Sequence, residues 1–391
     1  MALTDVFISP AGAGDEDGSS VANALPAIED GGGGDDWAPD FLALDRANKR
    51  FVFLTGTYNV QTKGTFSGSA PSATQPNQWV GADSSGNVLR PKFEETGLRL
   101  DTTNYPKFVC SANTPMLDTE ENTYYKCLSF ENTNTSYSQT SIIETSTADV
   151  DQQMWVGCEF LAKARNTSAK VMTATNCGFS HCVFEFNDAG RSTYDQVFKG
   201  TNNVHLSHCR IIGPSGPGEV LLASGGDQVG IEVTALTANI RNCVITRCNG
   251  HGFHLDSTSN KSDIDIAFCT ICHIGGDGVN TDNNTSAAPG KGSLEGCIIF
   301  DCTGDGINTN ADDSKQAGAQ MLAMGDNDSG NFNNMDSYED MIDVIAITTA
   351  DFIDYANKDY RIHRDSTLYR FYGTENFGAI QNDDFEFVSV S

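Results

Sequence analysis

Histidine, aspartate and asparagine recur at matching places in three successive segments, and these side chains could do chemistry. The segments read GHGFHLD from Gly250, GDGVNTD from Gly276 and GDGINTN from Gly304. If the apolar residue after each second glycine points inward, alternation along a strand sends its polar neighbours outward. Two outward rows result, one holding His254, Asn280 and Asn308 and the other holding Asp256, Asp282 and Asn310.

These rows suit two kinds of chemistry. On neighbouring strands, Asp256 and Asp282 would be separated by about one strand spacing, close to the ~5 Å between the carboxyl groups of a retaining glycosidase. His254 could orient or tune that pair, so these three residues are the catalytic candidates. All six residues also form a polar, amide-bearing surface that suits glycan binding without cleavage. We expect binding rather than cleavage, because strongly perturbed carboxylates are the exception among exposed ones.

Four short motifs resemble those of polygalacturonase-type hydrolases, but their order differs. They are Gly250 to Gly252 (GHG), Asn280 to Asp282 (NTD), Asp312-Asp313, and Arg361 to His363 (RIH). In that enzyme family NTD comes first and the last motif ends in lysine, whereas here GHG precedes NTD and the last motif ends in His363. The GHG also fills the place of GDG in the next two segments, so a structural repeat explains the matches.

A cysteine marks each repeat, and a glycine stands seven residues after it, as in Cys209 to Gly216 and Cys243 to Gly250. We expect these thiols to stack as a buried structural ladder of free cysteines, because a small apolar thiol suits a tight inward corner. The predicted ladder is Cys158, Cys177, Cys209, Cys243, Cys269 and Cys297. A zinc site at Cys269, Cys272 and His273 is the alternative, but no second ligand pair stands at finger spacing.

The elements that must position these residues are short strands. An apolar residue stands three positions before and two after each anchor cysteine, as Ile240 and Ile245 do around Cys243. The four clearest anchors lie 34, 26 and 28 residues apart, so the strands are constant while the connections vary. Such strands cannot bury their apolar side alone, and stacking successive repeats extends a sheet by about 4.8 Å per repeat.

The chain resembles the right-handed parallel β-helix proteins of pectate-lyase-like architecture. The resemblance rests on VFISPAGAGDEDGSS near the start, on RFVFLTGTYNV from Arg50 to Val60, and on the closing stretch from Asn357 to Ile380. It implies an all-β fold, a single-stranded right-handed parallel β-helix solenoid with capped ends. We expect an N-terminal strand and cap in residues 1–60, coils in 61–320, and a C-terminal excursion with a closing coil in 321–391.

Composition restricts the classes of partner. The 391 residues carry 24 Lys and Arg against 52 Asp and Glu, a formal charge of −28 that disfavours nucleic acid and anionic lipid. The chain begins without an export-type segment and holds no apolar run of membrane-spanning length, so we expect a protein made in the cytoplasm. No cofactor is expected, except that Asp326 and Asp328 form a weak match to a calcium loop.

Among β-helix proteins, the sequence looks most like the virion-associated members, such as phage tailspikes and capsid-surface proteins. That resemblance implies a structural or host-facing protein on the surface of a virus particle, with other virion proteins and a host-surface glycan as partners. Trimers are usual among such proteins, so a homotrimer is favoured. The alternatives are a polysaccharide lyase or glycoside hydrolase acting on an acidic glycan, and a bacterial carbohydrate-binding β-helix protein.

Overall fold

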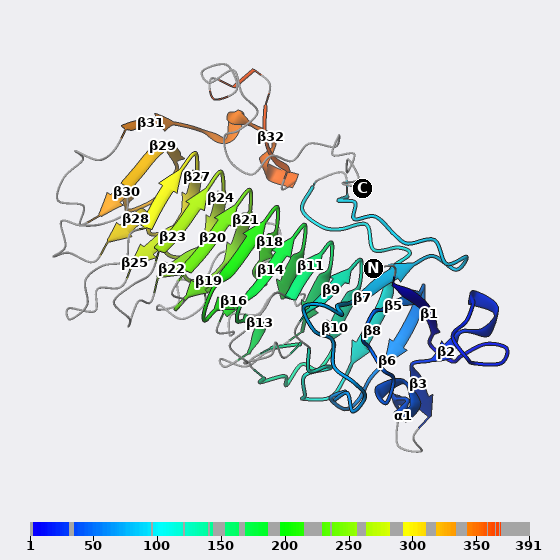
Figure 1. Cartoon of the computed structure of the whole chain (residues 1–391). Helices are drawn as coiled ribbons and strands as arrows, with labels where there is room; N and C mark the ends of the chain where they lie inside the picture. Colours follow the sequence, from blue (N-terminus) through cyan, green and yellow to red (C-terminus); the bar gives the residue numbers. More distant parts are fainter. Residues whose placement is uncertain are drawn as a thin grey trace.

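Parallel strands stack in register along one axis, from the blue N-terminal part to the orange C-terminal part of the chain (Figure 1). The structure is a computed structural model of the chain. It describes residues 3–30, 35–94, 97–119, 122–139, 141–143, 153–163, 169–186, 196–214, 229–234, 237–255, 263–281, 292–309, 318–333, 342–357, 359–363, 365–366 and 368. Their register defines a parallel β-helix, which confirms the predicted solenoid.

The solenoid has three faces, each a column of parallel strands. The first face holds β1 (Thr4–Ser9), β5 (Lys49–Leu54), β7 (Asn77–Ala82), β9 (Thr123–Lys126), β11 (Gln153–Val156), β14 (Cys177–Ser180), β17 (Val204–Ser207), β20 (Thr237–Arg241), β23 (Asp263–Ala267), β26 (Gly292–Glu295), β29 (Gly318–Gly325) and β31 (Ile342–Ala346). The second face holds β6 (Gly56–Asn59), β8 (Pro106–Cys110), β10 (Ser129–Asn132), β12 (Glu159–Ala162), β15 (Val183–Phe186), β18 (Arg210–Ile212), β21 (Val244–Cys248), β24 (Thr270–Ile274), β27 (Ile298–Cys302) and the end of β29. The third face holds β13 (Lys170–Ala174), β16 (Gln196–Gly200), β19 (Val229–Val233), β22 (Phe253–Leu255), β25 (Val279–Thr281), β28 (Asp305–Thr309) and β30 (Gly330–Asn333).

The corner between the first and second faces is a single left-handed residue. In successive coils it is Cys127, Gly157, His181, His208, Asn242, Phe268 and Gly296, all with φ between 53° and 61°. Its amide donates to the residue that ends the first-face strand of the next coil, as from Asn242 to the Ala267 carbonyl (3.0 Å). One left-handed residue at this corner therefore turns the chain while keeping the coils hydrogen-bonded.

The inward side chains of the three faces meet in one continuous core. On the second face, Phe108, Phe130 and Phe160 stack in successive coils, with ring centroids 5.0 and 5.6 Å apart. Further along, the same row continues with Ile245 and Ile271. The core thus changes from aromatic to aliphatic along the axis.

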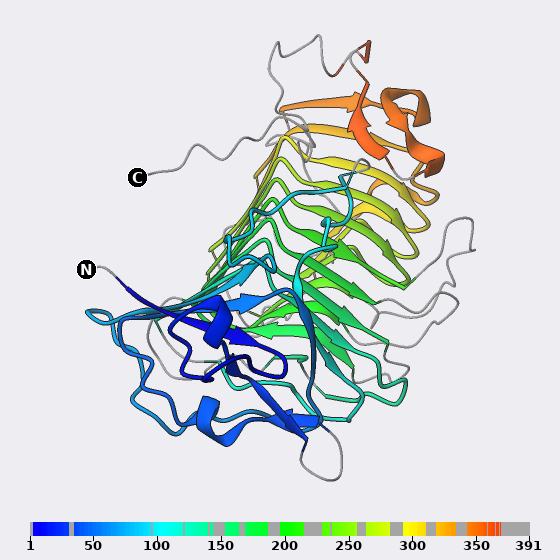
Figure 2. The same ribbon diagram turned by 90° about the vertical axis from the view of Figure 1, so that its right-hand side faces the viewer.

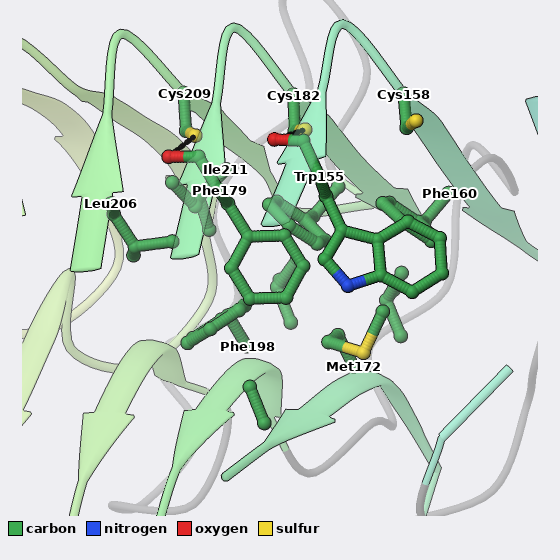
Figure 3. Packing of buried hydrophobic residues seen from close by; sticks show 14 of the residues in the cluster. Trp155, Cys158, Phe160, Met172, Phe179, Cys182, Phe198, Leu206, Cys209 and Ile211 are labelled. Atoms are coloured by element: carbon green, nitrogen blue, oxygen red, sulfur yellow. Dashed lines mark hydrogen bonds between the residues drawn. The ribbon is translucent and has the colours of Figure 1, made fainter. Parts of the chain in front are cut away.

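The cysteine ladder lies immediately after the left-handed corner, and one predicted member is wrong. The strand register aligns Cys182 with Cys158 on one side and with Cys209 on the other, and the three thiols form a row in Figure 3. Cys177 instead begins β14 on the first face, opposite Gln153. The observed ladder is Cys158, Cys182, Cys209, Cys243, Cys269 and Cys297. All twelve cysteines are buried and none forms a disulfide.

The N-terminal end of the core is covered by a cap. A short helix, α1 (Pro39–Leu42), lies beside a hairpin of β3 (Ile28–Asp30) and β4 (Asp35–Trp37). Trp37 and Phe41 stack with ring centroids 5.6 Å apart and are buried in the core. The short β2 (Leu25–Pro26) and a 3-10 turn, η1 (Val21–Asn23), complete this end.

Two segments cover the outside of the second face. One is the strap, which we define as residues 83–94 and 97–105; its Leu98, Leu100 and Tyr105 are buried against that face. The other is the C-terminal segment, with η3 (Thr349–Asp351), β32 (Phe352–Asp354), η4 (Tyr355–Asn357) and β33 (Asp359–Ile362). Figures 1 and 2 show this orange segment alongside the last coils.

In its described residues, the C-terminal segment does not form the predicted closing coil, and residues 369–380 of that stretch lie outside the described residues. Its β32 and β33 pair antiparallel with each other and do not extend a solenoid face. Tyr360 packs against the second face, with its hydroxyl 3.1 Å from that of Thr246. β29 also runs across the boundary predicted at residue 320. In the described part of the chain, no helix has the length and apolarity that crossing a bilayer requires.

Candidate functional site

The outer side of the third face carries a polar row on adjacent strands. Strand register aligns Lys199, Glu232, His254, Asn280 and Asn308 in that order. The structure therefore brings together the predicted His254, Asn280 and Asn308, while Phe253, Val279 and Ile307 are buried in the core. Five strands at about 4.8 Å spacing make the row about 19 Å long.

Glycines place this row by allowing a tight corner before each third-face strand. A Cβ at Gly252 would lie 2.7 Å from the carbonyl oxygen of Gly278, and a Cβ at Gly278 would lie 2.6 Å from that of Gly306. Any larger residue would force neighbouring coils apart. The residues between paired glycines, His251, Asp277 and Asp305, therefore lie at the base of the polar row.

Asp277 is the centre of the site. Its Oδ2 accepts hydrogen bonds from the amide nitrogens of Asn280 (2.8 Å) and Asn308 (3.0 Å). Its Oδ1 accepts from the backbone N–H of Asp305 (2.9 Å). Asp277 is 7% exposed. These three donors hold a buried carboxylate between two coils and fix both asparagine side chains.

His251 joins this centre from the preceding coil. Its Nδ1 accepts the backbone N–H of Asp277 at 3.1 Å and lies 3.4 Å from the Asp277 carboxylate. The rings of His251 and His254 are 5.8 Å apart and tilted by 42°. We call His251, His254, Asp277, Asn280, Asp305 and Asn308 the polar cluster.

Next to the polar cluster, the row continues with a charged group. Glu232 is 7% exposed and accepts hydrogen bonds from the ammonium of Lys199 and the side-chain amide of Gln196. The carboxylate is thus neutralised by an adjacent cation, which makes its burial tolerable.

The remaining predicted site residues either lie outside the described residues or lie elsewhere on the molecule. Asp256, Asp282, Asn310, Asp312 and Asp313 lie outside the described residues. Arg361 pairs with Asp359 inside the C-terminal segment, and the Nδ1 atom of His363 accepts the backbone N–H of Asp365. The RIH motif therefore belongs to the segment on the second face and contributes nothing to the third.

The residues of the alternative zinc site and of the weak calcium match do not form clusters. Cys269 faces the core, Cys272 faces the C-terminal segment, and His273 contacts Asp301 through its Nδ1 atom (3.0 Å), so the zinc ligands diverge. Asp326 and Asp328 are exposed on either side of Asn327. Within the described ranges, no group of three or more His, Cys, Asp or Glu side chains could hold a metal ion.

Sequence reasoning missed two features. The repeated GDG was interpreted only as an element of the structural repeat, although the aspartate of its first copy, Asp277, is the centre of the polar cluster. The buried charges beneath the strap gave no signal, because their partners are far apart in sequence. There, Glu185 is 2% exposed and pairs with Arg99, while the hydroxyl of Ser129 donates to Glu159 at 2.7 Å.

Burial raises the pKa of Glu159 to about 7, and the Ser129 hydrogen bond only partly offsets it. Near this cluster, an open polar pocket of about 390 Å³ lies between the strap and the second face, lined by Glu94, Asp101 and Lys107 among others. Its lining aligns Thr57 with Lys107 on adjacent strands, whereas the third-face row aligns five polar side chains, so the third face is the stronger candidate site.

Comparisons with known proteins add little about function. No protein-family model matches the chain, and no curated protein matches it. Among solved structures it is similar to the crystal structure of pectate lyase Pel9A, with 12% identity, 93% of this chain and 90% of that chain covered, and a TM-score of 0.46.

Proposed function

We propose that this protein binds a glycan along the third face and does not cleave it. The observation that carries the proposal is the register of the row, which presents an imidazole and two amides on adjacent strands at His254, Asn280 and Asn308. Amide, imidazole and carboxylate groups on a rigid surface can match the regularly spaced hydroxyls of an extended sugar chain.

The state of Asp277 argues against cleavage by the described residues. Its two oxygens already accept three hydrogen bonds from the protein. A nucleophile or general base must reach the substrate, and Asp277 has three of its four acceptor sites occupied and is only 7% exposed. Asp277 therefore acts as a positioning residue that holds the two asparagines.

Binding and cleavage are separated by one set of measurements. Purified wild-type protein is titrated with oligosaccharides, and the mixtures are assayed for new reducing ends and unsaturated ends. We expect binding without products. His254→Ala and Asn308→Ala should weaken binding, whereas Asn239→Ala on the first face should not. Products that disappear in Asp256→Asn or Asp282→Asn would establish the enzyme alternative instead.

The same proposal places the protein on the surface of a virus particle, as a trimer facing the host. A rigid solenoid with a formal charge of −28 suits exposure to salt water, because screening weakens the repulsion among its own charges. The charge would repel a polyuronate, which weighs against a lyase or hydrolase of acidic glycans. Mass spectrometry of purified particles is the test. The chain should be present in a fixed copy number, and its absence would leave the bacterial carbohydrate-binding alternative.

A further inference from the structure

Asn280 lies in the middle of the polar cluster and has a buried acceptor that the protein does not use. The residue is 5% exposed. Its Nδ2 donates to Asp277, so its Oδ1 points away from that carboxylate. No donor in the described part of the chain reaches Oδ1. A buried carbonyl oxygen without a donor costs free energy, so the site is one donor short.

The orientation of this amide is fixed by its neighbour. Exchanging the oxygen and nitrogen of Asn280 would bring Oδ1 against the Oδ2 of Asp277, an acceptor against an acceptor. It would also remove one of the three donors that hold the buried carboxylate. The free position on Asn280 is therefore an acceptor, which a ligand can satisfy only with a donor.

The groups around Asn280 reinforce this polarity. The carboxylate of Asp277 is 7% exposed and lies against the Asn280 amide. A buried carboxylate beside a free carbonyl oxygen favours hydroxyl or ammonium groups and repels a ligand carboxylate. The formal charge of −28 acts in the same direction at longer range.

We propose that the polar cluster selects glycans that present hydroxyl or ammonium donors, without carboxylates, and that Asn280 Oδ1 receives one of these donors. This inference rests on the proposed glycan binding and adds the class of sugar. It separates neutral and amino sugars from uronates.

The test is calorimetric titration of the full chain with three oligosaccharides of equal length: a neutral glucan, a chitosan and a galacturonan, the last with calcium chelated. The glucan, the chitosan or both should bind at least about tenfold more tightly than the galacturonan, and the better of the two identifies the donor as hydroxyl or ammonium. Asn280→Leu should weaken that binding by about tenfold. Asn239→Leu on the first face is the matched control and should bind as the wild type does.

Failure of this inference differs from failure of the proposed function. Tighter binding of the galacturonan would overturn the inference and leave glycan binding intact. The inference would also be overturned if folded Asn280→Leu bound the oligosaccharide as tightly as the wild type while His254→Ala bound it more weakly. No binding of any oligosaccharide would overturn both. If circular dichroism shows that Asn280→Leu is unfolded, the ranking of the three oligosaccharides by the wild type decides.

Discussion

At the scale of single residues, burial changes the chemistry of Glu159. Its pKa is raised to about 7, so between about pH 4 and pH 7 the folded chain binds a proton that the unfolded chain releases. The stabilisation is complete at low pH and is lost as pH rises through 7. The change in unfolding free energy caused by Glu159→Gln should therefore be more favourable at pH 8 than at pH 5, by up to about 3 kcal/mol.

Chemical denaturation of both proteins at pH 5 and pH 8 measures this difference. Gln still offers an oxygen to the Ser129 hydroxyl, so the variant keeps that hydrogen bond while losing the buried charge. Identical pH dependence in variant and wild type would show that Glu159 remains ionised in the folded chain.

Single residues also show where sequence reasoning was reliable. Strand alternation correctly separated inward Phe253 from outward His254, because period two is a property of the backbone. Cys177 was misplaced in the ladder since Phe179 stands two residues after it, just as Phe184 does after Cys182. The residue before each cysteine, Asn176 or His181, is left-handed, so this feature does not separate the two. Only the strand register does, because it places Cys177 opposite Gln153 and Val204 on the first face.

At the scale of the elements, the corner before each third-face strand depends on glycine. A Cβ at Gly278 would lie 2.5 Å from the Cγ2 of Ile299 and 2.6 Å from the carbonyl oxygen of Gly306, so the coils would have to separate. Gly278→Ala should cost at least about 2 kcal/mol of unfolding free energy, measured by chemical denaturation.

Gly200→Ala is the matched control on the same face. There the nearest atom, Cγ2 of Val204, would be 3.3 Å from the new Cβ, a contact that a small side-chain shift relieves. Equal losses in the two variants would mean that backbone entropy, rather than the close approach of coils, sets the cost.

The strap is a second element with a specific anchor. Arg99 is half-buried and pairs with Glu185, a carboxylate that is 2% exposed. In Arg99→Ala, the Glu185 carboxylate would keep Arg247 as a cationic neighbour, but the Nη1 atom of Arg247 is 4.0 Å away. We expect a loss of about 2 kcal/mol, because a buried charge loses its closest partner.

Hydrogen exchange locates the effect of this change. Amides of residues 97–105 should exchange faster in Arg99→Ala than in the wild type, while the coils keep their protection. Arg50→Ala removes a pair with Asp5 that is about one-third exposed on both sides, and should cost only a few tenths of a kcal/mol. Unchanged exchange of the strap would show that its apolar contacts alone hold it.

At the scale of the whole molecule, the solenoid could be predicted but its coverings could not. Repetition makes the coils visible, since the same inward row recurs in every coil and each occurrence supports the others. The strap and the C-terminal segment occur once each, and their partners on the second face are far away in sequence, as Tyr360 and Thr246 are. Nothing periodic marks such contacts, so the closing stretch was predicted to be another coil.

The charge of the whole molecule leads to a last prediction. A formal charge of −28 makes the folded state repel itself, because folding brings the carboxylates closer together. Raising the ionic strength from 0.01 M to 0.15 M shortens the screening length from about 30 Å to about 8 Å, which is less than the spacing of distant coils. The Tm should therefore rise with sodium chloride and level off once the screening length is short.

Tetramethylammonium chloride should give the same increase at equal ionic strength, since screening does not depend on which cation supplies it. A Tm that falls with salt would mean that attractive pairs such as Arg99 with Glu185 outweigh the net repulsion, and a rise with sodium alone would indicate specific ion binding.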